Sequence, residues 1–163
     1  KQSKKKEKSV IPEIKMFLTD CDGVLTDGGM YYSENGDELK KFNTKDGMGF
    51  SLLRERGIIT GIITGEDREL NLRRAKKLKI DEISSGVKDK KAELDRLCQK
   101  YNVAPENVAY IGDDINDIEV IKSVGLGCAV KDAAQSVLDC ASLITKAKGG
   151  QGAVREVIEM IIR

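Results

Sequence analysis

Two aspartates separated by one residue follow an apolar segment near the start of the chain. Asp20 and Asp22 come after 14–18, a run that is apolar apart from Lys15, and Gly23 follows them. An apolar run that ends at a glycine is typical of a buried strand and its turn, so both carboxylates are expected at the carboxyl end of a strand. Open α/β sheets bind ligands at that edge, and two carboxylates this close repel each other unless a cation lies between them.

A second acidic cluster has the same relation to another apolar run. Asp113, Asp114 and Asp117 lie in the segment Gly-Asp-Asp-Ile-Asn-Asp, directly after 108–111. Oxygen ligands from separate segments, with room left for waters and a phosphate, are what Mg²⁺ requires. A single aspartate after a strand is often only a turn former or a helix N-cap. The two clusters together favour a magnesium site over that alternative.

Two further polar groups complete a set that suits phosphoryl transfer. Thr64 and Gly65 end an apolar, β-branched run, and Lys90 begins a predicted helix. In such chemistry one carboxylate attacks phosphorus, and a second protonates the leaving oxygen and then activates water. A hydroxyl, a backbone N–H and an ammonium neutralise the phosphate oxygens, and Mg²⁺ holds nucleophile and phosphate together. The sequence therefore predicts a phosphate-transferring site at the strand ends.

Strands and helices alternate along the chain. Strands are expected at 14–18, 58–64, 82–84, 108–111, 127–130 and 142–145, and helices at 46–56, 66–78, 90–101, 116–123, 133–140 and 152–163. Two short strands at 30–32 and 38–42 flank Asn35-Gly36, which is a strong hairpin signal. The pattern predicts an α/β fold with a doubly wound, mostly parallel sheet covered on both faces, plus a hairpin insertion at 30–42.

Composition limits the class of protein. The chain has 163 residues with 28 basic and 27 acidic side chains, which fits one domain (11–163) and gives no overall field for nucleic acid or membrane. The basic start is expected to be a disordered tail (1–10). Without a long apolar span, and with four cysteines that lack metal-site spacing, the sequence favours a cytoplasmic protein with free thiols. Strand alternation directs Cys21 away from the acids.

From residue 14 onward, the chain resembles the haloacid dehalogenase-type phosphatase superfamily, which has a Rossmann-like core. All four motifs of that superfamily stand in order: Asp20-x-Asp22-Gly23-Val24-x-Thr26, Thr64-Gly65, Lys90, and Gly112-Asp113-Asp114-x-Asn116-Asp117. The resemblance implies Asp20 as nucleophile and Asp22 as general acid/base. It implies Thr64 and Lys90 as phosphate ligands.

The resemblance also implies the metal ligands. Mg²⁺ would be held by the Asp20 carboxylate, the backbone carbonyl of Asp22 and the Asp113 carboxylate. Asp114 and Asp117 would lie behind them and position Lys90 or metal-bound water.

A cap domain is expected in most members of this superfamily, but the chain has room only for a hairpin. The capless branch that it resembles is the sugar-acid phosphatases, which act on 3-deoxy-D-manno-octulosonate 8-phosphate or on nine-carbon sugar-acid 9-phosphates. The shared segments are 22–28, 41–49, 109–114 and 149–156. The resemblance implies a homotetramer in which the hairpins meet centrally and a neighbouring subunit closes each active site.

The residue after Thr64-Gly65 bears on the substrate. It is Glu66, whereas octulosonate phosphatases commonly carry an arginine there, so the resemblance favours a nine-carbon substrate such as KDN or N-acylneuraminate 9-phosphate. Arg74 and Lys77 would contact the substrate from a neighbouring subunit. The other expected substrate-binding residues are Gly65, Asp46, Gly47 and Arg155. Alternatively, Glu66 complements a helix dipole and the basic residues form a solvated face.

Other functions are weighed beside this one. The first alternative is the octulosonate 8-phosphate phosphatase of lipopolysaccharide synthesis. A second is a non-catalytic assembly domain of a sugar-acid cytidylyltransferase, which the intact set of acids disfavours. A mutase or phosphotransferase is also disfavoured, because without a cap the intermediate is open to water.

Overall fold

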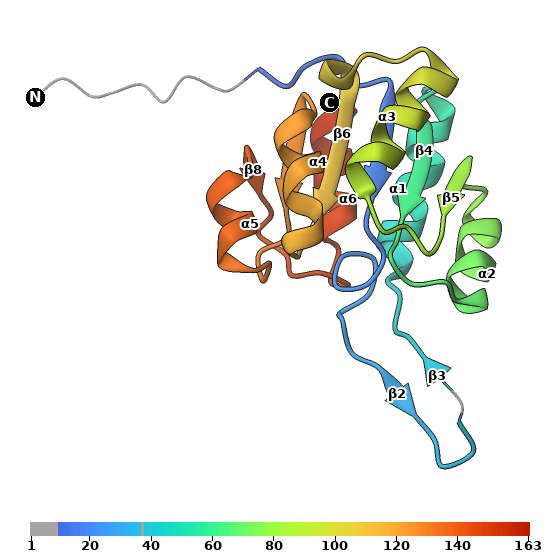
Figure 1. Cartoon of the computed structure of the whole chain (residues 1–163). Coiled ribbons are helices and arrows are strands. Elements are labelled where there is room, and N and C mark those ends of the chain that lie inside the picture. The colour runs from blue at the N-terminus through green and yellow to red at the C-terminus, as the bar shows by residue number, and fades with distance from the viewer. Residues whose placement is uncertain (1–9, 37) are drawn as a thin grey trace, which may run out of the picture.

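Six parallel strands form the centre of the molecule, in the order β5-β4-β1-β6-β7-β8 (Figure 1). In this computed structural model, which describes residues 10–36 and 38–163, the strands are β1 (Met16–Thr19), β4 (Ile59–Ile63), β5 (Glu82–Ser84), β6 (Val108–Gly112), β7 (Leu126–Ala129) and β8 (Leu143–Ile144). Each pairing between neighbours in this sheet is parallel. Parallel neighbours need crossover connections, which are usually helices. The predicted α/β fold is therefore confirmed.

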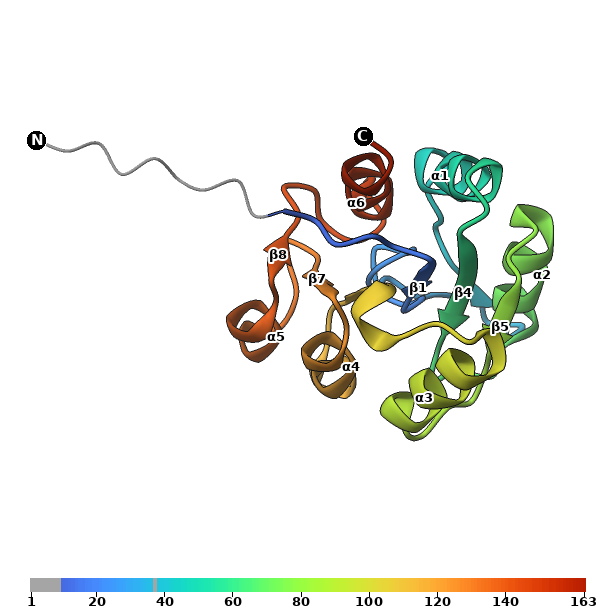
Figure 2. The ribbon, with the colours of Figure 1, turned by 90° about the horizontal axis from the view of Figure 1, so that it is seen from above.

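Helices cover both faces of the sheet, as the view from above shows (Figure 2). α1, α2 and α6 pack on one face, and α3, α4 and α5 pack on the other. Their bounds are α1 (Thr44–Glu55), α2 (Glu69–Leu78), α3 (Lys90–Tyr101), α4 (Ile118–Ser123), α5 (Gln135–Cys140) and α6 (Ala153–Ile161). The chain therefore forms three layers with a hydrophobic core on each side of the sheet.

The central strand β1 is covered on both faces, and for that reason its sequence does not alternate between apolar and polar residues. All four of its residues are buried. Met16 and Leu18 face the core shared with α3 and α4, while Phe17 faces the core shared with α1 and α6. A strand covered on both faces reads as a continuous apolar run. This buried strand fixes the position of the backbone directly before Asp20 and Asp22.

Some element bounds differ from the sequence prediction. α2 begins at Glu69 rather than Glu66, with Arg68 in extended backbone at its N-cap position. Glu66 therefore lies in the loop before the helix, and the alternative in which it complements the helix dipole is wrong. Two short 3₁₀ turns, η1 (Pro105–Asn107) and η2 (Ile115–Asp117), were not expected. η2 forms because Asp114 and Asp117 make a reciprocal capping box at its start.

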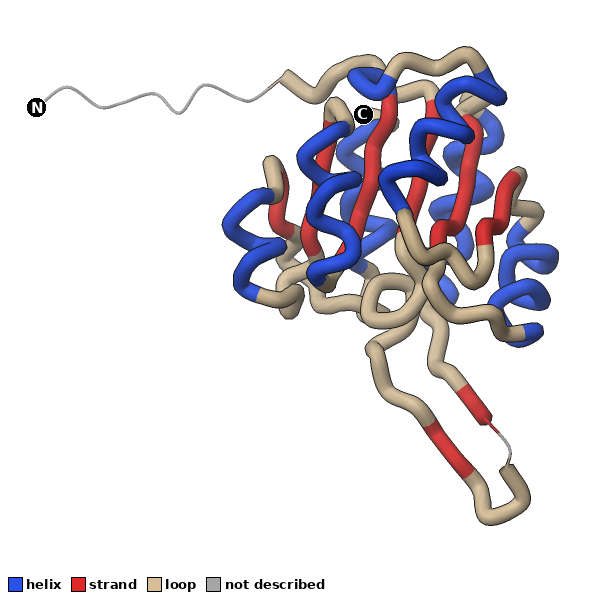
Figure 3. Tube along the Cα trace, viewed as in Figure 1, coloured by secondary structure: helices blue, strands red, loops and turns tan. Residues whose placement is uncertain are grey.

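A hairpin extends from the carboxyl edge of the sheet, the edge at which the parallel strands end (Figures 1 and 3). Its strands β2 (Tyr31–Tyr32) and β3 (Glu38–Leu39) are antiparallel, and a bridge between Thr26 and Phe42 closes its base. Tyr31 and Tyr32 are 54% and 70% exposed. The predicted hairpin is confirmed on both sides of residue 37.

Other sequence predictions can be compared with the fold directly. All four cysteines are free, and Cys21 points into the core, where its Sγ lies 3.5 Å from Asn71 Oδ1. None of the described helices is long and apolar enough to span a bilayer. The predicted tail falls almost wholly on residues 1–9, which lie outside the described residues.

Candidate active site

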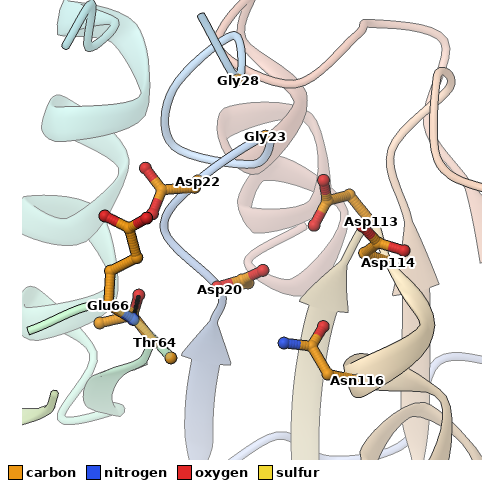
Figure 4. A pocket seen from close by; sticks show the side chains of 10 residues that line it. Asp20, Asp22, Gly23, Gly28, Thr64, Glu66, Asp113, Asp114 and Asn116 are labelled. Carbon is orange, nitrogen blue, oxygen red and sulfur yellow. Dashed lines mark hydrogen bonds between the residues drawn. The ribbon is translucent and has the colours of Figure 1, made fainter. Parts of the chain in front are cut away.

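Both predicted acidic clusters meet at a pocket on the carboxyl edge of the sheet (Figure 4). The cavity has a volume of about 280 Å³. Its lining consists of strand-end residues from three segments: Asp20, Asp22, Gly23, Gly28, Thr64, Gly65, Glu66, Asp113, Asp114 and Asn116. Asp20 lies at the floor, with Asp22 and Glu66 on one side and Asp113 and Asp114 on the other. Most of the residues that the sequence analysis placed at strand ends therefore line one pocket.

Asp20 is fixed by the sheet itself. Its backbone N–H donates to the carbonyl of Ile111 at 3.0 Å, which extends the pairing of β1 with β6 by one residue. The N–H of Cys21 donates to its Oδ1 at 2.7 Å. Burial raises the pKa of Asp20, and the charge of Asp117 adds to that, while Lys90 opposes both. A buried carboxylate held this firmly suits an attacking nucleophile, because its position is set before substrate arrives.

Lys90 lies at the first position of α3, and its side chain crosses to the pocket floor. Asp89 caps this helix by accepting from the N–H of Ala92. The Lys90 ammonium lies 3.0 Å from Asp20 Oδ1 and 2.8 Å from Asp117 Oδ1, with 1% of the side chain exposed. Burial lowers the pKa of Lys90, but the charges of the two aspartates outweigh burial and raise it overall. The ammonium therefore stays charged beside the nucleophile.

Asp117 is the acid that holds this region in place. Its Oδ1 accepts from Lys90 and from the hydroxyl of Tyr110. Its Oδ2 accepts from the backbone N–H groups of Asp113 at 2.9 Å and Asp114 at 3.2 Å. Both oxygens are thus engaged within the protein, and the expected supporting position behind the metal ligands stays a prediction. Asp114 also caps the N–H of Ile115 at 2.7 Å, so the backbone turn and the side chains fix each other.

Asp20, Asp113 and Asp117 each offer a carboxylate oxygen, and these atoms lie within 4.8 Å of one another. Burial raises the pKa of Asp113, and repulsion from Asp20 adds to it. A divalent cation would remove that repulsion and favour both carboxylates in the ionised form. Gly23 leaves the space that this needs, because a Cβ there would collide with Asp113 Oδ2 and its φ is +79°. The donor set therefore fits a hard cation such as Mg²⁺.

A second lysine, which the sequence analysis did not single out, contacts Asp22 at the rim of the pocket and itself lines a neighbouring cavity. Lys40 Nζ lies 2.8 Å from Asp22 Oδ1, and its side chain is 1% exposed. Burial lowers the pKa of Lys40, whereas its contact with Asp22 raises it more, so the net shift is upward.

Thr64 Oγ1 accepts from the N–H of Glu66 at 3.3 Å, which sets the direction of the loop after β4.

The remaining expected substrate-binding residues lie outside this pocket. Gly47, Arg74 and Lys77 line a separate surface groove between α1 and α2. Arg74 donates to the carbonyl of Asn43 at 3.2 Å and lies 5.3 Å from the ring centroid of Phe42. These contacts hold it against its own chain, so within one chain it does not reach the pocket.

Asp46 and Arg155 also serve the fold of their own chain. Asp46 is buried, and its Oδ1 accepts from the backbone N–H of Arg155 at 2.9 Å. It therefore caps α6, where Gly152 offers no side-chain cap. The Arg155 guanidinium donates to Glu159 and to the carbonyl of Lys45. The direct substrate contact expected of these two residues is not available within this chain.

Sequence reasoning missed several residues that the fold brings to the site. Asn116 and Gly28 line the pocket, and both stood in segments already quoted for the family resemblance. Tyr110, on β6, is fully buried and donates to Asp117. No signal pointed to Lys40, because a lysine on a hairpin limb normally reads as solvated.

Known proteins are similar to this chain in sequence and in fold. The family model described as haloacid dehalogenase-like hydrolase matches residues 67–158. The chain is 41% identical over 149 residues to the 3-deoxy-D-manno-octulosonate 8-phosphate phosphatase of Escherichia coli K12, covering 91% of this chain and 79% of that protein. It is similar to a probable YrbI family phosphatase from Pseudomonas syringae, with a TM-score of 0.90 and 46% identity over 93% of this chain and 86% of that one.

One similar structure was solved with ligands. The 3-deoxy-D-manno-octulosonate 8-phosphate phosphatase from Moraxella catarrhalis, in complex with magnesium, phosphate and KDO, has a TM-score of 0.89 and 40% identity, covering 91% of this chain and 86% of that chain. At these identities and coverages the likeness extends to family as well as fold. The chain belongs to the haloacid dehalogenase-like hydrolase family, and it is a phosphomonoesterase.

Proposed function

We propose that this protein is a magnesium-dependent phosphatase that hydrolyses 3-deoxy-D-manno-octulosonate 8-phosphate. The observation that carries the proposal is the set formed by the buried Asp20 and Lys90 and the half-buried Asp113 at the carboxyl edge of the sheet. The substrate follows from the relatives, since proteins 40–41% identical to this chain carry that activity in their names. The same relatives weigh against a non-catalytic assembly domain.

In the first half of the reaction, an oxygen of Asp20 attacks phosphorus and the bond from phosphorus to the sugar oxygen breaks. Asp22 donates a proton to that leaving oxygen. In the second half, Asp22 takes a proton from water while the water oxygen bonds to phosphorus and the bond to Asp20 breaks. Thr64 and Lys90 contact the remaining phosphate oxygens and stabilise their charge. Asp117 holds Lys90 in place through its ion pair.

Asp20, Asp113 and the backbone carbonyl of Asp22 would hold Mg²⁺. When bound, the ion supplies positive charge that offsets the charge of the phosphate and of the two carboxylates. Asp117 would not be a direct ligand, since both of its oxygens already accept hydrogen bonds from the chain. Asp114 would act from the loop that Asp117 positions.

A nine-carbon sugar-acid 9-phosphate is the second candidate substrate. Glu66 favours it, because this acid lines the pocket where the octulosonate branch commonly has an arginine. The relatives nevertheless support the octulosonate better than the nine-carbon substrate that the sequence analysis preferred. Phosphate release with Mg²⁺ tests the choice, with the two esters compared by kcat/KM. A higher value for the octulosonate would support the proposal, whereas a clear preference for the nine-carbon ester would overturn it.

The quaternary structure belongs to the same proposal. Tyr31, Tyr32 and Leu39 are exposed on the hairpin, and apolar side chains gathered on a projection favour association. We expect a homotetramer in which a neighbour closes the pocket and presents Arg74 and Lys77 to the substrate. Light scattering at assay concentration should give four times the chain mass. A monomer with full activity would exclude a neighbour's contribution.

A further inference from the structure

Lys40 places a buried positive charge beside Asp22, although it comes from an exposed hairpin. It directly follows β3, yet only 1% of its side chain is exposed. Lysine is seldom buried unless its charge is paired. Removing this ammonium from water costs free energy, so its contacts with neighbouring acids must compensate for that cost.

Three oxygens from three different segments surround the ammonium. Asp22 Oδ1 lies at 2.8 Å, Glu66 Oε2 at 3.4 Å and Asn71 Oδ1 at 3.3 Å. They come from the loop after β1, the loop after β4 and helix α2. Glu66 and Asn71 accept hydrogen bonds from the ammonium, whereas its close contact with Asp22 Oδ1 is an ion pair without hydrogen-bond alignment. The shortest contact is the one to Asp22, the residue that must move protons in the proposed reaction.

This contact distinguishes the two oxygens of Asp22. Because Lys40 holds Oδ1, Oδ2 is the oxygen left to carry the proton. The Asp22 side chain lies beside Glu66 at one side of the pocket, across from Asp113 and above Asp20 (Figure 4). An ion pair at one oxygen restricts the rotation of the carboxylate and therefore restricts where the other oxygen can lie during proton transfer.

We propose that Lys40 is a positioning residue for proton transfer by Asp22. It holds Asp22 through Oδ1, so that Oδ2 gives its proton to the leaving oxygen and later takes one from the attacking water. No proton passes to or from Lys40. The inference rests on the proposed phosphatase reaction, but it does not depend on which sugar acid is the natural substrate.

A neutral substitution tests the inference through its dependence on the leaving group. In Lys40→Met the side chains of Glu66 and Asp22 keep 49% and 30% exposure to water, so the chain should fold. A sugar-acid phosphate needs a proton on its leaving oxygen, whereas p-nitrophenolate leaves without one. Because general acid catalysis contributes 10²–10⁴-fold, kcat/KM should fall by about 100-fold for the sugar ester and by less than about fivefold for p-nitrophenyl phosphate.

Two controls separate positioning from a structural effect. Lys41→Met removes the neighbouring charge, which is exposed on the same limb, and should change neither rate. Lys40→Arg keeps the charge and should restore much of the activity on the sugar ester. A melting curve accompanies each variant, and Lys40→Gln replaces Lys40→Met if the latter does not fold.

A double-mutant cycle gives the decisive result. In an Asp22→Asn background, Lys40→Met should cost almost nothing further in kcat/KM for the sugar ester, since the partner is already lost. Equal losses on both esters, or an unchanged loss in the Asp22→Asn background, would overturn the inference. If the wild type cleaves p-nitrophenyl phosphate but not the octulosonate ester, the proposed substrate fails instead. The cycle is then run with ribose 5-phosphate as the alkyl ester.

Discussion

Lys90 and Lys40 offer a comparison within one active site. Each lysine side chain is 1% exposed, and each pairs with one aspartate of the first motif, although Lys90 is buried as a whole residue and Lys40 is only half-buried. Their partners differ. Lys90 lies between Asp20 and Asp117, which are 8% and 0% exposed, whereas the Lys40 partner Asp22 is 30% exposed. The first pair forms the pocket floor, and the second forms its rim.

The two pairs differ in the free energy that is lost when one member is removed. Removing one member of a buried pair leaves a charge that water cannot reach, which costs about 3–5 kcal/mol. At the rim, an acid that loses its partner can still be solvated. The floor should therefore couple stability to turnover, whereas changes at the rim should alter turnover with little effect on folding. Substitutions in the two regions test this expected difference in stability and turnover.

The nucleophile should show the largest effect. Asp20→Asn removes the attacking carboxylate while keeping an amide of the same shape beside Lys90. We expect kcat to fall by at least about 10⁴-fold, because the covalent step has no substitute nucleophile. Steady-state phosphate release measures this, and a circular dichroism spectrum like that of the wild type shows that the fold is kept. Turnover within tenfold of the wild type would remove Asp20 from that role.

Asp117→Asn tests the floor through stability. The amide has one oxygen and one NH₂, but the two sides of Asp117 need acceptors for Lys90 and Tyr110 and for two backbone N–H groups. One side must then face donor to donor in either orientation. We expect the free energy of unfolding to fall by about 2–4 kcal/mol.

Asp22→Asn is the matched change at the rim. Its amide oxygen can still accept from Lys40, and Glu66 and Asn71 still face the ammonium. Its free energy of unfolding should stay within about 1 kcal/mol of the wild type. Urea titrations of both variants give the comparison, and equal losses would show that floor and rim do not differ in this respect.

Metal binding gives a smaller effect that is confined to the floor. In Asp113→Asn one of the carboxylates that repel each other becomes neutral, so less is gained when a cation binds. The Mg²⁺ concentration for half-maximal activity should rise by about tenfold, and Mg²⁺ should raise the melting temperature of the wild type more than that of the variant. The same change at Asp114, which caps a backbone N–H, should shift both quantities less. An unshifted Mg²⁺ titration would exclude Asp113 as a ligand.

The sequence singled out the acids of both the floor and the rim, but it did not single out Lys40. Asp20, Thr64, Lys90 and Asp113 stand at the ends of buried apolar runs or at the start of a helix, so the periodicity that predicts the sheet also places them together. Lys40 lies on an exposed hairpin limb whose short strands bury little. Its position depends on how that limb folds back over the loops after β1 and β4, and local patterns do not record such long-range contacts.

Long-range contacts that local patterns do not record also explain two other differences, namely the wrongly predicted start of α2 and the roles of Asp46 and Arg155. The charged residues after Thr64 have good helix propensity, yet residues 65–68 stay in the loop that lines the pocket. Asp46 and Arg155 are 109 positions apart in the chain. Their contact arises only because α1 and α6 pack together on one face of the sheet, so sequence alone read both as free to bind substrate.

Asp46 supplies the smallest effect and a reference for the comparison, because it is a buried acid whose partners are backbone N–H groups rather than a lysine. Burial raises its pKa from 3.8 to about 6, although hydrogen bonds from the N–H groups of Arg155 and Gly152 and the charges of Arg74 and Arg155 oppose this. A raised pKa means that the folded chain binds the proton more tightly. The contribution of Asp46 to stability is therefore most favourable below pH 3.8, falls as the pH rises through the window up to about 6, and stays low above it.

Asp46→Asn should remove that dependence, because the amide oxygen can still accept from the N–H of Arg155 while carrying no charge. At pH 7.5 we expect the variant to match the wild type or exceed its free energy of unfolding by about 1 kcal/mol. The difference should shrink or reverse at pH 4, where the wild-type carboxyl is protonated in the folded chain. Urea titrations at both pH values measure it. If the variant instead loses more stability at pH 7.5 than at pH 4, then the N–H groups, together with Arg74 and Arg155, stabilise Asp46 as an anion.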